Sequence, residues 1–253
     1  MKIPHIGRMT VAAHRGDSYN EYENTMTAFR AAVAAGADMI ETDVHLSRDG
    51  VAVIMHDRTV DRTTDGTGII DDKTLSELKA LNAASPDAPE ALPTLAEFMA
   101  WAAELPISLN LEIKEYYSPE NEARTVACIE AVIAEIEKYG LRERVVINSF
   151  DAWILEYVYK KYGKAYMLHG FYPYSAMKNL SIDPTEYLYC ACIWGKNEKK
   201  HYDFLIEHGI EPWIGASVTQ KAKLAVCLSY GARLVTTNNP KDTIQKLTEL
   251  DAR

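Results

Sequence analysis

The stretch "MTVAAHRGDSYNEYENTMTAFRAAVAAGADMIETDVHL", residues 9–46, sets the pattern that decides the fold. Its first five residues, "MTVAA", predict a strand. The segment "NTMTAFRAAVAAG" predicts a helix that begins at Asn24 or Thr25 and ends at Gly36. The last ten residues, "ADMIETDVHL", predict a second strand. A strand, a helix and a strand in this order are the unit from which α/β proteins with parallel sheets are built.

The same alternation continues to the end of the chain. Six further strand-like runs follow: "ISLNLEIK", "RVVINSF", "KAYMLHG", "YLYCACI", "IEPWIG" and "ARLVTTN". Between them lie the helical stretches "PENEARTVACIEAVIAEIEKYG", "DAWILEYVYKKYG", "KKHYDFLIEHG" and "TQKAKLAVCLSYG", each ending in the Gly that a helix C-terminus prefers. Eight strands, most followed by a helix, predict an α/β protein folded as one (β/α)8, or TIM, barrel over residues 1–253. A doubly wound open sheet is the alternative.

One region interrupts this rhythm. From Asp57 to about Leu92 the chain is polar, rich in Thr, Asp and Gly, and carries one short helical stretch. We expect a small inserted subdomain, about residues 57–92, after the region of the second barrel strand. It does not resemble a linker between two domains.

The composition indicates an ordinary globular protein, since 47% of residues are hydrophobic and 25% are charged. The formal net charge of -9 argues against nucleic acid as a partner, because such binders need a dense basic surface. The first residues contain no apolar signal segment, and no apolar run approaches the length of a membrane span. We therefore expect a soluble, cytoplasmic protein without stable membrane insertion. Cys190 and Cys192 alternate within "YLYCACIW", which favours buried thiols over a disulfide.

Carboxylates gather where the expected strands end. Glu41 and Asp43 are two residues apart on one strand and therefore point the same way. Glu112 stands at a comparable place in "ISLNLEIK", with Lys114 on the same face. Three carboxylates suit a hard divalent cation such as Mg²⁺ or Ca²⁺. Pairing of these acids with Arg15, Lys114 or another basic group is the alternative, and spacing alone leaves both open.

Two histidines stand at strand ends on the same expected rim. His14 precedes Arg15, and His56 follows the apolar run "VAVIM". A single histidine at a strand end is more often a hydrogen-bonding or surface residue. Two of them beside an acidic cluster and a cation match what general acid and base catalysis on a metal-held phosphate needs. His169, at the end of "KAYMLHG", is a weaker candidate for the substrate side, and His45 is more simply a rim-lining or solvated residue.

Several sequence blocks resemble the signature of the glycerophosphodiester phosphodiesterase family, within the superfamily of phospholipase-C-like phosphodiesterases. The blocks are "HRG" at 14–16, "ENT" at 23–25, "GAD-IE-DV-LS-DG" through 36–50, "HD" at 56–57, "RTTDGTG" at 62–68, "PTLAE" at 93–97, "LEIK" at 111–114 and "SF" at 149–150. They occur in order, at family-like spacing, over most of the chain.

The resemblance implies a TIM barrel with an insert after His56, and hydrolysis of glycerophosphodiesters to sn-glycerol 3-phosphate and an alcohol with a divalent cation. It implies an acid and base pair, two phosphate-binding cations and three metal ligands. The acid and base pair is His14 and His56, the phosphate-binding cations are Arg15 and Lys114, and the metal ligands are Glu41, Asp43 and Glu112.

Departures from the family pattern concern the substrate side of the rim. Tyr22 replaces the Pro that often precedes "ENT", and Asn238 replaces the acid of the usual Thr-Asp-x-Pro block. At the seventh strand the usual "WTVN" is "WIGA", so that Trp213 remains as a predicted substrate contact. These positions leave the preferred diester open.

Two other functions are compatible with the resemblance. One is a lyase that forms a cyclic phosphate from lysophospholipids or sphingomyelin-like diesters, but the long insert after His56 favours the hydrolase. The other is a non-catalytic glycerophosphodiester-binding protein, which is disfavoured because every position needed for chemistry is filled. The choice of Mg²⁺ or Ca²⁺, the headgroup, the nucleophile and the oligomeric state stay open.

Overall fold

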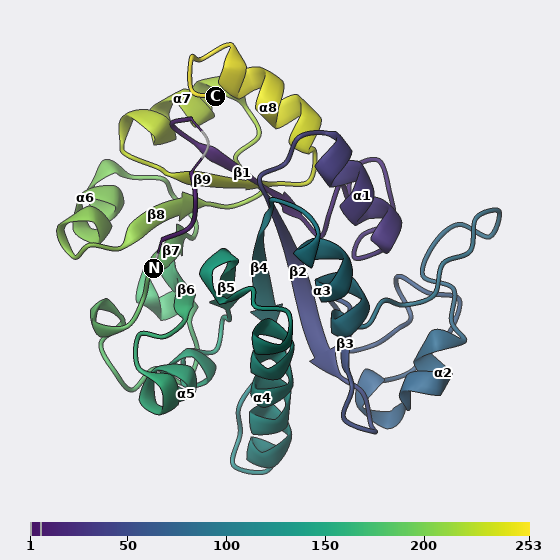
Figure 1. The fold of residues 1–253 in the computed structure, drawn as a ribbon. Helices are drawn as coiled ribbons and strands as arrows, with labels where there is room; N and C mark the ends of the chain where they lie inside the picture. Colours follow the sequence, from purple (N-terminus) through teal and green to yellow (C-terminus); the bar gives the residue numbers. More distant parts are fainter. Residues whose placement is uncertain (1, 6) are drawn as a thin grey trace.

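Eight parallel strands close into a barrel (Figure 1). The computed structural model describes residues 2–5 and 7–253. The strand order is β1-β9-β8-β7-β6-β5-β4-β2, and β1 also pairs with β2, which closes the sheet. The barrel strands are β1 (Thr10–His14), β2 (Met39–Leu46), β4 (Ser108–Ile113), β5 (Val145–Asn148), β6 (Met167–Tyr172), β7 (Cys190–Ile193), β8 (Glu211–Ile214) and β9 (Leu234–Thr237). The predicted TIM barrel is confirmed, and the alternative of an open sheet is wrong.

Helices surround the barrel (Figure 1). They are α1 (Met26–Ala34), α2 (Leu75–Lys79), α3 (Leu95–Ala103), α4 (Glu122–Lys138), α5 (Ala152–Tyr162), α6 (Lys199–Glu207), α7 (Lys221–Ser229) and α8 (Pro240–Thr248). Thr25 is the N-cap of α1, because its Oγ1 accepts from the Ala28 N–H at 3.1 Å. Between β6 and β7 the described chain forms two short 3-10 helices, η3 (Tyr174–Ala176) and η4 (Pro184–Glu186), and no α-helix.

The barrel interior toward the N-terminal ends of the strands is filled by side chains. One apolar cluster lies among the barrel strands, and its members are Ile3, Ala12, Met39, Val146, Met167, Cys190, Trp213 and Leu234. At the start of β8, Glu211 Oε1 accepts from the Tyr189 hydroxyl at 2.9 Å, and Glu211 Oε2 lies 2.9 Å from His5 Nε2. A barrel interior of this kind is a packed core, so that space for a ligand is found at the opposite, C-terminal end of the strands.

The chain between β2 and β4 leaves the barrel. Strand β3 (Ala52–Ile54) runs antiparallel to β2, and η1 (Ile70–Asp72) and α2 follow it at the side of the barrel (Figure 1). This part has its own apolar cluster, made of Val53, Met55, Val60, Ile70, Leu78, Ala83 and Leu92. Helix α2 begins with a capping box, since Thr74 and Glu77 bond each other's backbone N–H groups.

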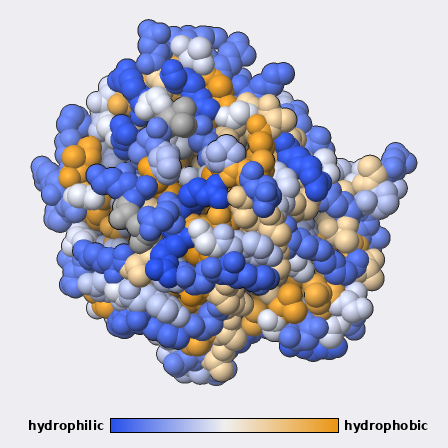
Figure 2. Space-filling model, viewed as in Figure 1, coloured by the Kyte–Doolittle hydropathy of each residue, from blue (hydrophilic) through white to orange (hydrophobic). Residues whose placement is uncertain are grey.

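The surface in Figure 2 is mostly hydrophilic, with hydrophobic residues scattered over it. In the part of the chain that the structure describes, no helix has the length and apolar character to cross a membrane. All four cysteines are buried and free, which confirms the prediction of buried thiols at Cys190 and Cys192.

Candidate active site

The predicted site residues meet at the C-terminal ends of neighbouring strands. His14 at the end of β1 is level with Glu41 on β2, and Asp43 on β2 is level with Glu112 on β4. A cavity of about 600 Å³ opens at this end of the barrel. The predicted residues that line it are His14, Arg15, Glu41, His56, Glu112, Lys114 and His169.

Three carboxylates form a buried cluster beside the cavity. Glu41, Asp43 and Glu112 each offer an oxygen within 4.8 Å of the others. The three residues are only 3%, 1% and 6% exposed, respectively. Burial, together with Asp43 and Glu112, holds the pKa of Glu41 well above its ordinary value. Burial also raises the pKa of Glu112 to about 7. Three acids this close need positive charge to be ionised together.

Two cations of the protein supply part of that charge. Lys114 Nζ lies 2.6 Å from Glu112 Oε1 and 3.2 Å from Asp43 Oδ1, and Arg15 Nε lies 3.3 Å from Asp43 Oδ2. Burial acts to raise the pKa of Asp43, but Lys114 and Arg15 outweigh it and hold that pKa below the ordinary value. Burial acts to lower the pKa of Lys114, yet Asp43 and Glu112 raise it overall, so the ammonium stays charged.

The ring of His14 is fixed by a residue that follows β9, the strand next to β1. Its Nδ1 lies 2.6 Å from Asn238 Oδ1, and its Nε2 lies 3.9 Å from Glu41 Oε2. Because an amide oxygen can only accept, Nδ1 carries the proton and Nε2 is the basic nitrogen. Burial and the neighbouring Arg15 lower the pKa of His14, which keeps Nε2 free to accept a proton. Asn238 is the amide that departs from the family's acid, and its contact with His14 was not expected.

His56 is held through a chain of charged side chains. Its Nδ1 lies 2.6 Å from Asp57 Oδ1, and Arg62 Nε donates to Asp57 Oδ2 at 2.6 Å. The hydrogen bond from Arg62 is the main reason that the pKa of Asp57 falls to about 2. Arg62 also donates to Glu23 Oε1 at 2.7 Å, and Glu23 accepts from Arg15 at 2.9 Å. One chain of contacts therefore joins His56 to the cation beside the carboxylate cluster.

Two residues of the "HRG" and "ENT" blocks adopt left-handed backbone conformations, Arg15 at φ 58° and Asn24 at φ 59°. The Arg15 N–H donates to the Glu41 carbonyl at 2.8 Å and lies 3.1 Å from Glu41 Oε2. The Asn24 amide donates to Asp43 Oδ2 at 2.9 Å and accepts from Thr42 Oγ1 at 2.8 Å. Both bends therefore place a donor against a carboxylate of the cluster, a role that the sequence analysis did not predict.

Eight of the nine predicted site residues line the cavity or belong to the carboxylate cluster beside it, and Trp213 does neither. It is fully buried in the barrel and does not line the cavity. Its ring centroid lies 4.8 Å from that of His169, so it supports a residue that does line the cavity. Because Trp213 precedes Gly215 by two residues, it points inward one level deeper than the rim. Its predicted substrate contact stays a prediction.

His45 differs from its expectation as a rim-lining or solvated residue. It is 3% exposed, and its Nε2 lies 3.1 Å from the His56 carbonyl. The antiparallel pairing of β2 with β3 covers this residue, because His45 is level with Val53. The excursion after β2 therefore buries a side chain that the strand pattern alone places at the rim.

Sequence comparison identifies relatives of known family. The Glycerophosphoryl diester phosphodiesterase family profile matches residues 14–239. A glycerophosphodiester phosphodiesterase from Caldanaerobacter subterraneus subsp. tengcongensis is 43% identical over 156 residues, which cover 59% of this chain and 61% of that protein. Glycerophosphodiester phosphodiesterase 1 from Homo sapiens is 39% identical over 124 residues, covering 46% and 37% of the two chains. The matches thus span less than two thirds of these relatives.

Solved structures share the fold over nearly the whole chain. An Oleispira antarctica phosphodiesterase in complex with the product sn-glycerol-3-phosphate has a TM-score of 0.82 at 24% identity, covering 94% of this chain and 96% of that one. A glycerophosphodiester phosphodiesterase from Parabacteroides distasonis has a TM-score of 0.79 at 23% identity, covering 96% and 98%. At these identities the likeness establishes the fold.

Proposed function

Because the chain belongs to the glycerophosphoryl diester phosphodiesterase family, we propose that it hydrolyses glycerophosphodiesters to sn-glycerol 3-phosphate and an alcohol. One observation carries the proposal: His14 and His56, each fixed through Nδ1, open into the same cavity as the buried carboxylates and their cations. A cavity of about 600 Å³ suits a small-molecule diester.

The carboxylate cluster fits a divalent cation. All three donors are hard carboxylate oxygens, buried and close together, which is the donor set that Mg²⁺ or Ca²⁺ takes. Glu41, Asp43 and Glu112 would hold this ion. When bound, it would draw negative charge away from the phosphoryl oxygens. The ion would also balance the acids that Lys114 and Arg15 neutralise only in part.

The histidines would act as general base and general acid. Nε2 of His14 has a free lone pair and can take a proton from the attacking hydroxyl. His56, with Nδ1 held by Asp57, can give or take a proton at its other ring nitrogen. Arg15 and Lys114 would bind the phosphoryl oxygens, where their charge stabilises the transition state. His169 and Trp213 would lie on the substrate side.

Residues 57–92 would act as an inserted subdomain of one catalytic domain. Two observations support this: the separate apolar cluster and the position of Arg62, which lies within the segment and holds Asp57. The insert would thereby help to position His56. The cytoplasmic location stays a prediction from the sequence.

The test is release of glycerol 3-phosphate from glycerophosphocholine, glycerophosphoethanolamine and a lysophospholipid, each with Mg²⁺, Ca²⁺ or EDTA. We expect cation-dependent turnover that His14→Ala and His56→Ala each reduce by about 10²- to 10⁴-fold, as loss of an acid or base does. His201→Ala, on α6 and outside the residues that line the cavity, is the control and should retain the full rate. No turnover of any diester with either cation would refute the hydrolase, and accumulation of a cyclic phosphate as the end product would indicate a lyase.

A further inference from the structure

A second cavity, of about 530 Å³, adjoins the catalytic cavity at the ends of β7 and β8. Residues 195–197, 217–218, 222–223 and 226–227 line it, and we call it the side groove. Gly195 after β7 and Ser217 after β8 line both cavities. Apart from its chain neighbours, a Cβ atom at Gly195 would meet no described atom within 4 Å, so space is open where the two cavities meet. An alcohol that leaves from the catalytic cavity can therefore extend into the side groove.

The side groove carries positive charge, although the formal net charge of the chain is -9. Lys196 and Lys223 line it, and none of the described residues in its lining is acidic. The nearby Lys199, Lys200 and Lys221 lie 2.5, 2.7 and 2.7 Å from acidic side chains. Within residues 2–5 and 7–253, by contrast, Lys196 and Lys223 form no ion pair. Two cations without a local acid attract anions, so the groove favours a negatively charged ligand.

The other polar side chains of the side groove can donate hydrogen bonds. Asn197 Oδ1 accepts from the Tyr202 hydroxyl at 2.6 Å, which leaves the Asn197 amide N–H groups to bond a ligand. Tyr202 is fully buried, so its position fixes the orientation of this amide. The Ser217 hydroxyl can donate as well. Two ammonium groups and two uncharged donors form a set that suits the oxygens of a phosphate.

The side groove also has an apolar side, which favours an organic ligand over a free inorganic ion. Val218 and Cys227 are buried, whereas Val226 is 44% exposed and lines the groove. The methylene groups of an alcohol would cover Val226, and removal of apolar surface from water is favourable. The groove therefore combines a surface for a short carbon chain with cations for a charge at the end of that chain.

We propose that the side groove is a subsite for the leaving alcohol, and that it selects diesters whose alcohol carries an anionic group such as a second phosphate. Lys196 and Lys223 would bind this group, and Val226 would pack against the carbon chain before it. The inference rests on the proposed function and adds to it the class of alcohol that the enzyme prefers. The bond that breaks, at the first phosphate, stays the same.

The experiment compares two substrates that differ by one phosphate. They are the glycerol 3-phosphate diesters of propane-1,3-diol and of 3-hydroxypropyl phosphate, and both release glycerol 3-phosphate. We expect the wild-type kcat/KM to be about tenfold higher for the second diester, because Lys196 and Lys223 are exposed and each such ion pair adds modestly. Added salt should shrink this preference. The double variant Lys196→Gln with Lys223→Gln should reduce it to within about twofold.

The matched control is the double variant Lys164→Gln with Lys241→Gln. Both lysines are exposed and lie outside the lining of the two cavities, so the control removes the same charge elsewhere. It should keep the wild-type preference. Equal wild-type kcat/KM values for the two diesters would overturn the subsite. A preference that the groove variant keeps, or that the control variant loses to the same extent, would overturn it as well.

Binding distinguishes failure of the subsite from failure of the proposed activity. If wild type hydrolyses neither diester, the hydrolase proposal fails, while calorimetry with the same two intact diesters still tests the side groove. Tighter binding of the diester with the second phosphate, lost in the groove variant and kept in the control variant, supports the subsite. Equal affinities of wild type for the two diesters would overturn it.

Discussion

At the scale of single residues, the contact that fixes one ring nitrogen of a histidine decides which nitrogen is left to exchange a proton with the substrate. His14 and His56 both present one nitrogen to the cavity because Asn238 and Asp57 hold the other. These two partner residues differ in their distance along the chain from the histidine that they contact. Asp57 follows His56 directly, whereas Asn238 lies 224 residues from His14 and reaches it only because β9 pairs with β1.

Arg62 should matter for turnover although it touches no predicted reacting group. Arg62→Ala removes its contacts with Asp57 and Glu23, which lets the His56 ring shift. We expect kcat to fall by up to about a hundredfold, as small misplacements of catalytic groups do, with partial recovery in Arg62→Lys. Steady-state kinetics over a range of pH checks this. Arg58→Ala, which loses an exposed pair with Asp71, is the control. A full rate in Arg62→Ala would contradict the positioning role.

Cation binding should stabilise the fold through the three carboxylates. A ligand at about a hundred times its Kd adds about 2.7 kcal/mol to the unfolding free energy, so Mg²⁺ or Ca²⁺ should raise Tm and EDTA should lower it. Asp43→Asn should abolish the shift, because Asp43 lies within the cluster. Asp203→Asn, on the exposed face of α6, should retain it. Thermal melts of both variants with and without cation measure the effect, and a shift that survives in Asp43→Asn would place the ion elsewhere.

At the scale of elements, the segment before β1 is tied to β8. His5 Nε2 lies 2.9 Å from Glu211 Oε2, and the Tyr189 hydroxyl donates to the same carboxylate. Burial acts to raise the pKa of Glu211, but the hydrogen bonds from His5 and Tyr189 lower it below 4.5 overall. A carboxylate with a lowered folded-state pKa stabilises the fold at pH above 4.5.

Glu211 should therefore contribute to acid unfolding. Its stabilising effect is present above the unfolded pKa of 4.5 and is lost as pH falls through the lower folded value. Glu211→Gln should be less stable than wild type near pH 7, and the difference should narrow as pH falls below 4.5. Urea unfolding at several pH values checks this, with Glu249→Gln at the exposed C-cap of α8 as the control. A difference independent of pH would show that the carboxylate charge has no part in it.

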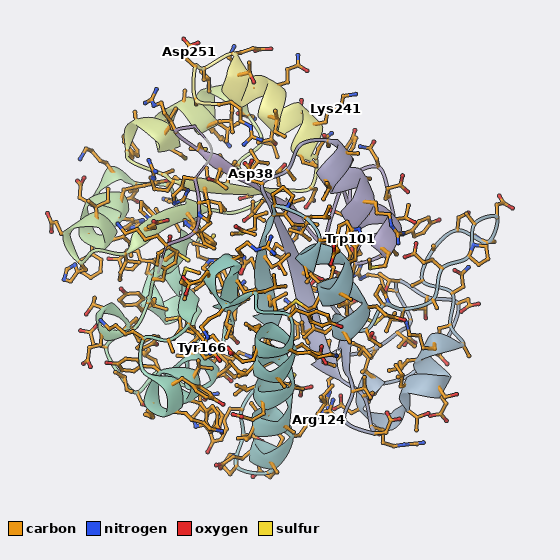
Figure 3. All side chains as sticks on the ribbon, viewed as in Figure 1. Asp38, Trp101, Arg124, Tyr166, Lys241 and Asp251 are labelled. Carbon is orange, nitrogen blue, oxygen red and sulfur yellow. The ribbon has the colours of Figure 1, made fainter. Side chains whose placement is uncertain are left out.

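At the scale of the whole molecule, α4 connects the barrel to the segment after β3. Arg124, labelled on α4 in Figure 3, contacts Asp71 Oδ1 and Glu115 Oε1, each at 3.0 Å, and the Leu46 carbonyl. Glu115 is 7% exposed, so little water could solvate its carboxylate if Arg124 were removed. One side chain thus joins η1, the end of β2 and the loop after β4.

Removing Arg124 should destabilise the protein more than removing an exposed arginine. Arg124→Ala leaves the buried Glu115 unpaired, which we expect to cost about 3 kcal/mol. Arg142→Ala breaks an ion pair with Glu137 whose members are 45% and 40% exposed, and should cost about 1 kcal/mol or less. Urea unfolding compares the two, and limited proteolysis should cut Arg124→Ala first within residues 57–92. Equal losses in both variants would refute the bridging role.

Periodicity along the chain is enough to predict the barrel strands, because each strand is a short apolar run ending at a turn or at polar residues. All eight runs named from the sequence became barrel strands. Helices α3 and α8 were not among the predicted helices. The apolar residues of α3, "LAEFMAWAA", leave no clear polar face, and "PKDTIQKLT" of α8 has few apolar positions. In both, the helix is decided by its N-cap and by packing on the barrel.

The convergence of His14, Glu41, Asp43, Glu112 and Lys114 follows from the sequence alone, since the carboxyl ends of parallel strands share one rim. The support of these residues depends on tertiary structure. Asn238 beside His14 joins strands that meet only when the barrel closes, and the cavity-lining residues Asn110, Asn148 and His169 come from three separate strands. The position of Trp213 below the rim is set by the register of β8. Local patterns determine which residues stand at strand ends, whereas closure of the sheet determines which of them touch, because contacts between distant strands have no local signal.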